Sequence, residues 1–331
     1  MFGRRPWRHN RRLCSNNEYR LVWKEAQMKI AIVGAGAMGQ LFGAHLIAAG
    51  HTVTMIDSSE MICDGINLDG IKVRIGGQEF HVSAKAATAQ ASEDVVDVIM
   101  IFTKGPHTRS AVASVRHLIT DETVGVSLQN GLGNEEPLVE VFGVDRTIIG
   151  MTDFPSDRAE DSVIYSEPTG HVVLGGLREG THDKAQLIAH ILDESGMNAS
   201  FDPNVIIPIW EKVIFNAVYN MVSGATGLTV GGICDVPEAR NLATEILNES
   251  LKVVWDEGIA IDEERIRENI MHAHQNHADH KTSMLVDIES GRPTEIETIG
   301  GAIERTGKRT GTPTPTLSAV CNLIRIQERN R

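Results

Sequence analysis

The 331-residue sequence is poor in cysteine, in aromatic residues and in long apolar runs. Its four cysteines form no C-x-x-C pair, which favours inert thiols over bridges and a reducing, cytoplasmic compartment. No run approaches the roughly 18 apolar residues that a membrane-spanning helix needs, so no membrane partner is expected. Net positive charge is also lacking, since the formal net charge is -13. A nucleic-acid partner, which would require a basic face, is therefore not expected.

Charge is distributed unevenly along the chain. Residues 1–27 contain seven Lys or Arg and two Glu, a balance of +5, so the remaining residues carry -18. An Arg-rich, acid-poor stretch resembles an organelle presequence, but this one lacks a clear amphipathic apolar face. A disordered extension, or a start assigned too early because Met28 directly precedes the first strand, is the favoured interpretation. Residues 1–27 are therefore not expected to belong to the folded domains.

The stretch that follows has the pattern of a dinucleotide-binding βαβ unit. Lys29 to Val33 is typical of a strand buried on both faces. The glycines of the next segment have the G-x-G-x-x-G spacing that gives a tight turn, close approach to a pyrophosphate and close helix packing. A helix expected from Ala37 to Ala49 would direct unpaired N–H groups at that pyrophosphate. The segment reads Gly34, Ala35, Gly36, Ala37, Met38 and Gly39.

An acidic residue stands where such a unit would bind a ribose. Thr52 to Ile56 is predicted to be the second strand, and Asp57 follows it, 23 residues after Gly34. A carboxylate there can accept hydrogen bonds from both ribose hydroxyls and would repel a 2′-phosphate. Asp57 therefore favours NAD(H) over NADP(H). Because strand, turn, helix, strand and acid occur in order, a glycine-rich turn without a ligand is the weaker alternative.

Two polar residues follow later predicted strands. Segments 71–75 and 79–82 flank a Gly-Gly pair and predict a hairpin, whereas 95–102 and 123–128 suit buried parallel strands. Lys104 follows the first of these buried strands and Asn130 follows the second. Ligands of open α/β sheets lie beyond the carboxyl ends of the strands, so both residues are expected at the cofactor. A solvated lysine and a turn asparagine are the alternatives.

The chain is predicted to form two domains. Short strands at 147–151, 163–165 and 171–174, with a helix near 183–195, complete an α/β Rossmann-like dinucleotide-binding domain over residues 28–203. From residue 206 onward almost everything has helical periodicity, and Pro313 and Pro315 lie in a loop before a final helix. Residues 204–331 are therefore expected to form an all-helical C-terminal domain that carries the substrate and catalytic residues.

A polar stripe interrupts one apolar helix of this second domain. The segment 208–223 is apolar nearly all round, yet Lys212, Asn216, Asn220 and Ser223 are spaced by four, four and three residues. A buried lysine is costly unless it is paired or solvated, so the stripe is expected to line a cleft or meet a partner. A polar seam between helices is the structural alternative. In carbonyl reduction, an ammonium could stabilise and protonate the oxygen that gains negative charge.

A third segment brings more polar residues into the helical domain. Residues 282–301 contain Ser283, Asp287 and Glu295. A glutamate near Lys212 would keep the ammonium charged and directed. The alternative for Glu295 is a solvated acid at a helix start, because it follows Pro293 and Thr294.

These motifs together resemble the ketopantoate reductases (2-dehydropantoate 2-reductases). The resemblance runs from Met28 to about Glu328 and includes the glycine turn, Lys104, and the QNGLG that begins at Gln129. It also includes the K-x-x-x-N-x-x-x-N that begins at Lys212, and the segment SML to GRPTEI over residues 283–296. Membership would imply a helical domain like that of 6-phosphogluconate dehydrogenases, an active site between the domains, a small 2-keto acid substrate and NADPH as the usual cofactor.

The resemblance also implies roles for individual residues. Lys212 would be the general acid, and Glu295 would orient it and touch the cofactor. The keto acid would be held by Asn130, Lys212, Asn216, Asn220 and Ser283. The residue pattern itself already assigns the cofactor to Gly34, Ala35, Gly36, Ala37, Met38, Gly39 and Asp57. With the resemblance, the cofactor contacts also include Lys104, Asn130, Ser156 and Glu295.

The sequence departs from the family pattern at several places. Asp57 stands where a basic or neutral residue is usual, which again favours NADH, and segment 150–156 reads GMTDFPS with an unusual Asp-Phe-Pro before Ser156. Gly300 replaces a usual asparagine, and Val230 stands where some relatives use an asparagine for substrate. The expected activity is reduction of a branched 2-keto acid, ketopantoate first, to (R)-pantoate. A D-mandelate-type D-2-hydroxyacid dehydrogenase and a non-catalytic nucleotide sensor are the alternatives, and a homodimer is possible.

A histidine cluster raises the question of a metal. It consists of His272, His274, His277 and His280, and histidines three apart on a helix can share an ion. No cysteine or second helper acid has a fixed metal-ligand spacing, and hydride transfer needs no metal. A solvated helix face whose end borders the substrate site is therefore predicted, without a metal.

Overall fold

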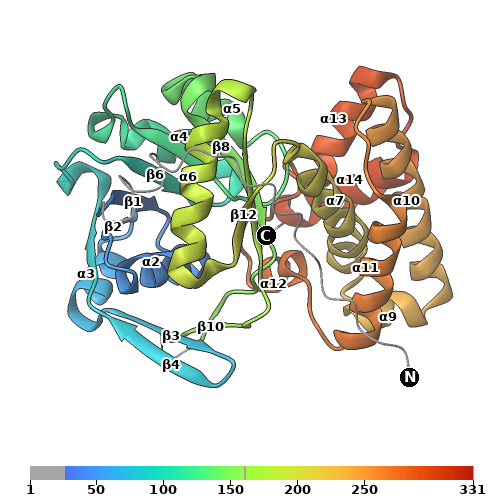
Figure 1. The fold of residues 1–331 in the computed structure, drawn as a ribbon. Coiled ribbons are helices and arrows are strands. Elements are labelled where there is room, and N and C mark those ends of the chain that lie inside the picture. The colour runs from blue at the N-terminus through green and yellow to red at the C-terminus, as the bar shows by residue number, and fades with distance from the viewer. Residues whose placement is uncertain (1–26, 160–161, 331) are drawn as a thin grey trace, which may run out of the picture.

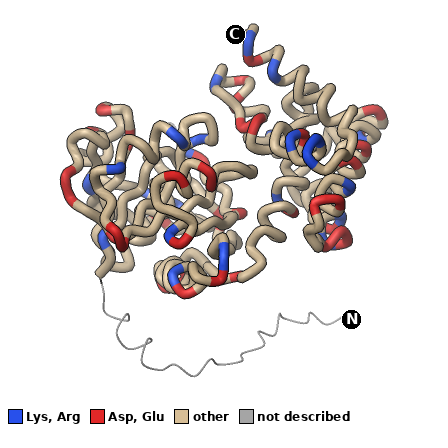
Figure 2. Tube along the Cα trace, turned by 90° about the horizontal axis from the view of Figure 1, so that it is seen from above, with Lys and Arg blue, Asp and Glu red and all other residues tan. Residues whose placement is uncertain are grey.

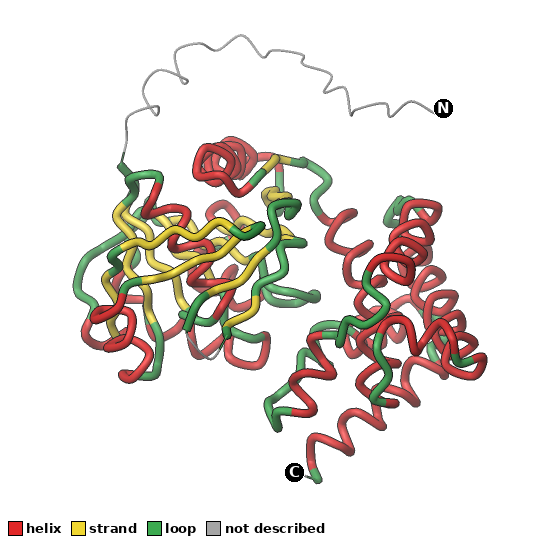
Figure 3. Tube along the Cα trace, turned by 90° about the horizontal axis from the view of Figure 1, so that it is seen from below, coloured by secondary structure: helices red, strands yellow, loops and turns green. Residues whose placement is uncertain are grey.

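The computed structural model describes residues 27–159 and 162–330, which form two lobes (Figure 1). Within these residues all strands belong to the lobe that ends near residue 201, whereas the lobe from residue 206 onward is helical (Figure 3). The predicted fold class, a Rossmann-like domain followed by a helical one, is confirmed. The prediction for residues 1–27 concerns a segment that, apart from Gln27, lies outside the described residues.

The first lobe is built on a sheet in the order β12-β11-β8-β7-β6-β1-β2-β5. Its neighbouring strands are parallel except where β11 pairs antiparallel with β8. The strands are β1 (Lys29–Val33), β2 (Thr52–Ile56), β5 (Lys85–Ala87), β6 (Val98–Ile101), β7 (Val124–Ser127), β8 (Thr147–Thr152), β11 (Val172–Gly176) and β12 (Ala199–Phe201). The strand expected over 95–102 is therefore shorter than predicted and begins at Val98.

Both faces of this sheet are buried, because side chains alternate along each strand. In β1, Ile30 and Ile32 belong to the core beneath one set of helices, whereas Ala31 and Val33 belong to the core on the opposite face. The first core includes residues of α2 (Ala37–Ala48) and α6 (His182–Leu192), and the second includes residues of α4 (Thr108–Ser114) and α5 (Glu135–Phe142). This double burial explains the continuous apolar runs of the central strands.

A smaller sheet has the order β4-β3-β10-β9. The predicted hairpin is present as β3 (Ile71–Ile75) and β4 (Gln78–Val82), which follow α3 (Glu60–Asp69). The strand predicted near 163–165 is β10 (Ile164–Ser166), and it pairs with β3 and with β9 (Asp157–Arg158) rather than with the main sheet. Pairing between segments so distant along the chain could not be inferred from local pattern.

The helical lobe packs its apolar residues into one core. Its helices are α7 (Ile206–Asn216), α8 (Val222–Thr226), α9 (Val230–Asp235), α10 (Pro237–Asp256), α11 (Glu263–Asn276), α12 (Ser283–Glu289), α13 (Gly300–Thr310) and α14 (Pro315–Arg329). The single helix expected over 208–223 is interrupted, because a π-helical turn (Ala217–Met221) joins α7 to α8. Of the helices that the structure describes, none has the length and apolarity to cross a membrane.

Seen from above, acidic and basic residues are interspersed over both lobes (Figure 2). Many form pairs at the surface, such as Arg109 with Glu140 and Lys252 with Asp256. Exposed pairs of this kind contribute little to stability, about 0–1 kcal/mol each. Other charged groups are withdrawn from water, including some that lie between the lobes.

Candidate active site

A cleft of about 1420 Å³ lies between the two lobes. The α/β lobe contributes the end of β8, the loop after it, and residues on and next to β11 and β12. The helical lobe contributes α7, α11 and the start of α12. A cleft of this size can take a small acid together with part of a dinucleotide. The substrate residues predicted from sequence all border it: Asn130, Lys212, Asn216, Asn220 and Ser283.

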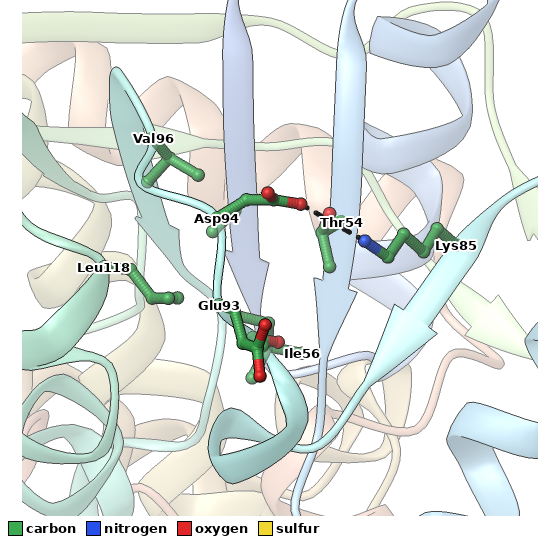
Figure 4. A pocket seen from close by; sticks show the side chains of 9 residues that line it. Thr54, Ile56, Lys85, Glu93, Asp94, Val96 and Leu118 are labelled. Carbon is green, nitrogen blue, oxygen red and sulfur yellow. Dashed lines mark hydrogen bonds and ion pairs between the residues drawn. The ribbon is translucent and has the colours of Figure 1, made fainter.

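A second pocket, beside β2 and β5, is far smaller. Its lining includes Thr54, Ile56, Val96 and Leu118, together with Lys85 and Asp94, which form an ion pair at 3.3 Å (Figure 4). Its volume of about 10 Å³ has room for no more than about one water molecule. The cleft between the lobes is therefore the candidate site.

Lys212 reaches across the cleft from the helical lobe to the sheet. It extends from α7, and its ammonium donates a hydrogen bond to the carbonyl oxygen of Thr152, the last residue of β8. Burial lowers the pKa of Lys212 to about 8, and the carboxylates of Asp153 and Glu295 oppose that shift. A lysine with a pKa near neutrality can both give and take a proton at physiological pH.

Glu295 lies next to this lysine and to the loop after β7. The Asn130 side-chain amide donates to Glu295 Oε2 at 3.2 Å, which joins the two lobes. Burial raises the pKa of Glu295, whereas the hydrogen bond from Asn130 and the charges of Lys104 and Lys212 oppose the rise. Glu295 lies in the bend that precedes α13 and its carboxylate is largely withdrawn from water, so the alternative of a solvated acid at a helix start is wrong.

The remaining polar residues of the stripe are divided between cleft and core. Asn220 is buried, and its Oδ1 accepts hydrogen bonds from the Met284 N–H at 3.2 Å and from the Ser283 hydroxyl at 3.4 Å, so it fixes the start of α12. Asn216 borders the cleft one turn earlier. Ser223, expected on the same stripe, donates instead to the Leu228 carbonyl at 2.6 Å and does not border the described cleft. The π-helical turn before Ser223 widens the helix and changes its angular position.

The glycine turn is braced by Asp57. One carboxylate oxygen accepts from the Ala35 N–H at 2.9 Å and the other from the Ser59 N–H at 3.0 Å. Asp57 is thus fixed at the end of β2, directly beside the turn that precedes α2. Thr103, beyond the end of β6, has a buried hydroxyl with no hydrogen-bond partner in the part of the chain that the structure describes. An unsatisfied buried hydroxyl and open N–H groups at a helix start fit a dinucleotide.

Two glycines of this turn are expected to have different roles, Gly39 in packing and Gly36 in ligand binding. A Cβ on Gly39 would lie 2.0 Å from the Gly34 carbonyl oxygen, whereas a Cβ on Gly36 would meet no atom within 4 Å. Gly39→Ala is therefore expected to lower the free energy of unfolding by roughly 1–3 kcal/mol. Gly36→Ala should leave it unchanged but fill the space that a pyrophosphate needs, weakening NADH binding by about tenfold, or roughly 1.4 kcal/mol.

Urea unfolding and NADH titration of both variants measure the two effects. Equal loss of stability in Gly36→Ala and Gly39→Ala would show that the turn has no space reserved for a ligand. Unaltered NADH affinity in a folded Gly36→Ala variant would place the cofactor elsewhere.

Lys104 is directed toward the helical lobe. Its ammonium pairs with Asp287 Oδ1 at 2.5 Å and donates to the Pro293 carbonyl at 3.2 Å. Asp287 is buried and also pairs with Arg292 at 3.0 Å. The Leu132 N–H also donates to the Thr298 carbonyl at 2.8 Å, which is a further link between the lobes. The Lys104 ammonium therefore takes part in the contact between the lobes, just beyond the strand end where the cofactor is expected.

Ser156 and the histidine cluster are placed differently with respect to the cleft. Ser156 lies outside the lining of the cleft, and its hydroxyl is buried without a partner among residues 27–159 and 162–330. His272, His277 and His280 border the cleft, as the solvated-face interpretation expects, but His274 does not. In the same described residues, no three metal-ligating side chains approach closely enough to hold an ion.

Two residues of this site were missed in the sequence. Asp153 borders the cleft directly after β8, and Thr103 lies just beyond β6. Their position at the carboxyl ends of strands is the signal that identified Lys104 and Asn130. Applied to every predicted strand, it would have identified Asp153 and Thr103 as well.

A glycine turn that fits a pyrophosphate, an acid at the ribose position and a buried lysine at a cleft between lobes define a nicotinamide-dependent oxidoreductase. Comparison with protein families makes this more specific. Residues 30–179 match the family model for ketopantoate reductase PanE/ApbA, and residues 204–328 match the model for its C-terminal region. The chain belongs to the ketopantoate reductase family, whose members are NAD(P)H-dependent reductases.

Curated relatives and solved structures extend over almost the whole chain. The chain is 29% identical to the 2-dehydropantoate 2-reductase of Lactococcus lactis and 30% identical to that of Pyrococcus horikoshii, in each case covering 91% of this chain and 98% of the relative. The structure of D-mandelate dehydrogenase with NADH and anilino(oxo)acetate is 29% identical, with a TM-score of 0.86 and coverage of 92% and 99%. That of the 2-dehydropantoate 2-reductase from Geobacter metallireducens is 26% identical, with a TM-score of 0.84 and coverage of 90% and 99%.

Proposed function

We propose that the protein reduces 2-dehydropantoate, a branched 2-keto acid, to (R)-pantoate with NADH. The observation that carries the proposal is the position of Lys212, a buried ammonium next to Glu295 in a cleft bordered by asparagines. The names of the Lactococcus and Pyrococcus relatives support the choice of substrate. A protein that only senses nucleotides would have no use for a proton donor at this position, which argues against the nucleotide-sensor alternative.

Lys212 acts as the proton donor. When bound, the nicotinamide supplies a hydride to the keto carbon. The keto oxygen then gains negative charge, which the Lys212 ammonium stabilises before giving up its proton. A pKa of about 8 suits this step, because the lysine is mostly protonated at neutral pH and still gives its proton readily. In the oxidation of a 2-hydroxy acid, the neutral amine would take the proton back.

The surrounding polar groups orient the reactants. Glu295, held by Asn130, keeps the lysine directed, and the amides of Asn216 and Asn220 with the Ser283 hydroxyl suit a carboxylate and a hydroxyl. Asn220 Oδ1 is already occupied by the start of α12, so its NH₂ group is the part left for substrate. The cofactor is held by Gly34, Ala35, Gly36, Ala37, Met38, Gly39 and Asp57, with Thr103, Asn130 and Glu295 toward its nicotinamide end.

Asp57 supports NADH as the preferred cofactor. Its carboxylate is fixed beside the glycine turn by the Ala35 and Ser59 N–H groups, where it would face the ribose and repel a 2′-phosphate. The D-mandelate dehydrogenase structure, 29% identical, contains NADH. We further propose that residues 28–203 bind the cofactor and residues 204–331 carry the substrate site, a division that the start of the second family match at residue 204 supports.

Aromatic residues of the cleft make an aryl 2-keto acid the second candidate. Phe154, Phe215 and Tyr219 border the cleft, and the D-mandelate dehydrogenase likeness points the same way. Initial rates with ketopantoate and with phenylglyoxylate, each under NADH and NADPH, separate the candidates. The proposal predicts the highest kcat/KM for ketopantoate with NADH. A higher value for phenylglyoxylate would assign a mandelate-type enzyme, and no turnover of any 2-keto acid would overturn the reductase assignment.

A further inference from the structure

Asp153 is fixed at the edge of the cleft by the backbone around it. It directly follows β8, its N–H donates to the His171 carbonyl at 3.1 Å, and its Oδ1 accepts from the His171 N–H. The next residue, Phe154, is buried against Gly170. These contacts leave the Asp153 carboxylate exposed on the cleft wall, and its second oxygen has no hydrogen-bond partner among the described residues.

Lys212 meets the α/β lobe at this point. Its ammonium donates to the carbonyl of Thr152, the residue before Asp153. Three other acids border the cleft on that side: Asp157 on β9, Glu167 and Asp202. None of them is among the acids that shift the pKa of Lys212. A place on the cleft wall is therefore not enough by itself to influence the Lys212 ammonium.

The charges around Lys212 come from several elements. Asp153 on the sheet side favours its charged form most, followed by Glu295 from the turn before α13. Glu211, the preceding residue on α7, is already paired with Arg265 of α11, and Lys104 of the first lobe is paired with Asp287 of α12. Burial raises the pKa of Glu295, which makes that acid the weaker counter-ion. Asp153 keeps its hydration because it faces the open cleft.

We propose that Asp153 is a positioning residue that keeps the Lys212 ammonium charged and directed at the keto oxygen. This inference rests on the proposed role of Lys212 as proton donor. The α/β lobe then supplies one counter-ion through Asp153, and the helical lobe supplies the other through Glu295. One carboxylate from each lobe thus opposes the effect of burial on the ammonium that lies between them.

Replacing Asp153 by asparagine tests the charge while keeping the shape. The backbone need not move in this variant, because the side-chain oxygen of an asparagine can still accept the hydrogen bond from the His171 N–H. Loss of a nearby opposite charge lowers a lysine pKa by about one unit or more. Reduction needs protonated Lys212, so kcat falls as pH rises through that pKa. In Asp153→Asn this fall is expected about one pH unit lower, with rates near those of the wild type at acidic pH.

Matched variants separate charge from structure. Asp157→Asn should have the pH profile of the wild type. Asp153→Glu, which keeps the negative charge, should have it too. In the oxidation of the hydroxy acid, where neutral Lys212 is needed, the rising limb should also move to lower pH in Asp153→Asn. Should that variant fail to fold, Asp153→Ser, which can still accept from His171, must give the same displacement. A uniform loss of rate at every pH, with the profile unmoved, would refute the proposal.

A readout independent of substrate keeps this test distinct from that of the proposed function. The pH dependence of Lys212 acetylation by acetic anhydride, followed by peptide mass spectrometry, reports the pKa of that amine directly. We expect it to move down by about one unit in Asp153→Asn and to stay in place in Asp157→Asn. If the labelling moves but no 2-keto acid is turned over, the proposed function fails and the pairing stands. If Lys212→Met abolishes turnover but labelling does not move in Asp153→Asn, only the pairing fails.

Discussion

Replacing Lys212 by methionine is expected to lower kcat for 2-keto acid reduction by about 10²–10⁴-fold, the usual contribution of a positioned general acid. Methionine keeps much of the apolar stem that extends from α7 but cannot donate a proton. Because Lys212 lies at the substrate end of the cleft and not at the glycine turn, the affinity for NADH should be retained. Initial rates together with fluorescence titration of NADH measure both quantities.

An exposed lysine of the same lobe provides the control. Lys252 of α10 pairs with Asp256 at the surface, its side chain 60% exposed, and takes no part in the cleft. Lys252→Met should therefore leave kcat and KM unchanged. If Lys212→Met turned over substrate at the rate of the wild type, Lys212 could not be the proton donor.

Replacing Asp57 by serine is expected to change the cofactor preference toward NADPH. The ratio of kcat/KM for NADH to that for NADPH should fall by about tenfold or more, since juxtaposed like charges cost several kcal/mol. The reason is the fixed carboxylate beside the ribose position, held by the N–H groups of Ala35 and Ser59. Initial rates at several concentrations of each cofactor give the two values.

Asp57→Asn distinguishes charge from support of the turn. Asparagine also removes the charge but keeps an oxygen that can accept from a backbone N–H, so the ratio should change while thermal stability falls less than in Asp57→Ser. Each lost hydrogen bond is worth about 1 kcal/mol. An unaltered preference in both variants would mean that another residue selects the cofactor.

Local patterns predicted the parts of the molecule that local physics determines. The βαβ unit, the β3–β4 hairpin and the helical second lobe each follow from apolar spacing or glycine position within a short segment. The polar residues at 212, 216 and 220 were found because helical periodicity places them on one face. Ser223 was misplaced by the same rule, because the turn before it is π-helical.

Contacts between the lobes could not be predicted from the sequence. Asn130 and Glu295 are 165 residues apart, and Lys104 and Asp287 are joined across a similar distance along the chain. No periodicity connects such positions, because their contact depends on how the finished lobes pack. The small sheet shows the same effect, since β10 pairs with β3 and not with the strands of the main sheet.

A crystal structure of the enzyme with NAD⁺ and (R)-pantoate would show whether Lys212 is the proton donor. We expect the pantoate 2-hydroxyl oxygen at about 2.6–3.2 Å from Lys212 Nζ. The nicotinamide ring should face the hydroxyl-bearing carbon, and the acid carboxylate should contact Asn216 or Ser283. A bound acid whose hydroxyl is held by another residue, with Lys212 still donating only to the Thr152 carbonyl, would refute the role of Lys212 as proton donor.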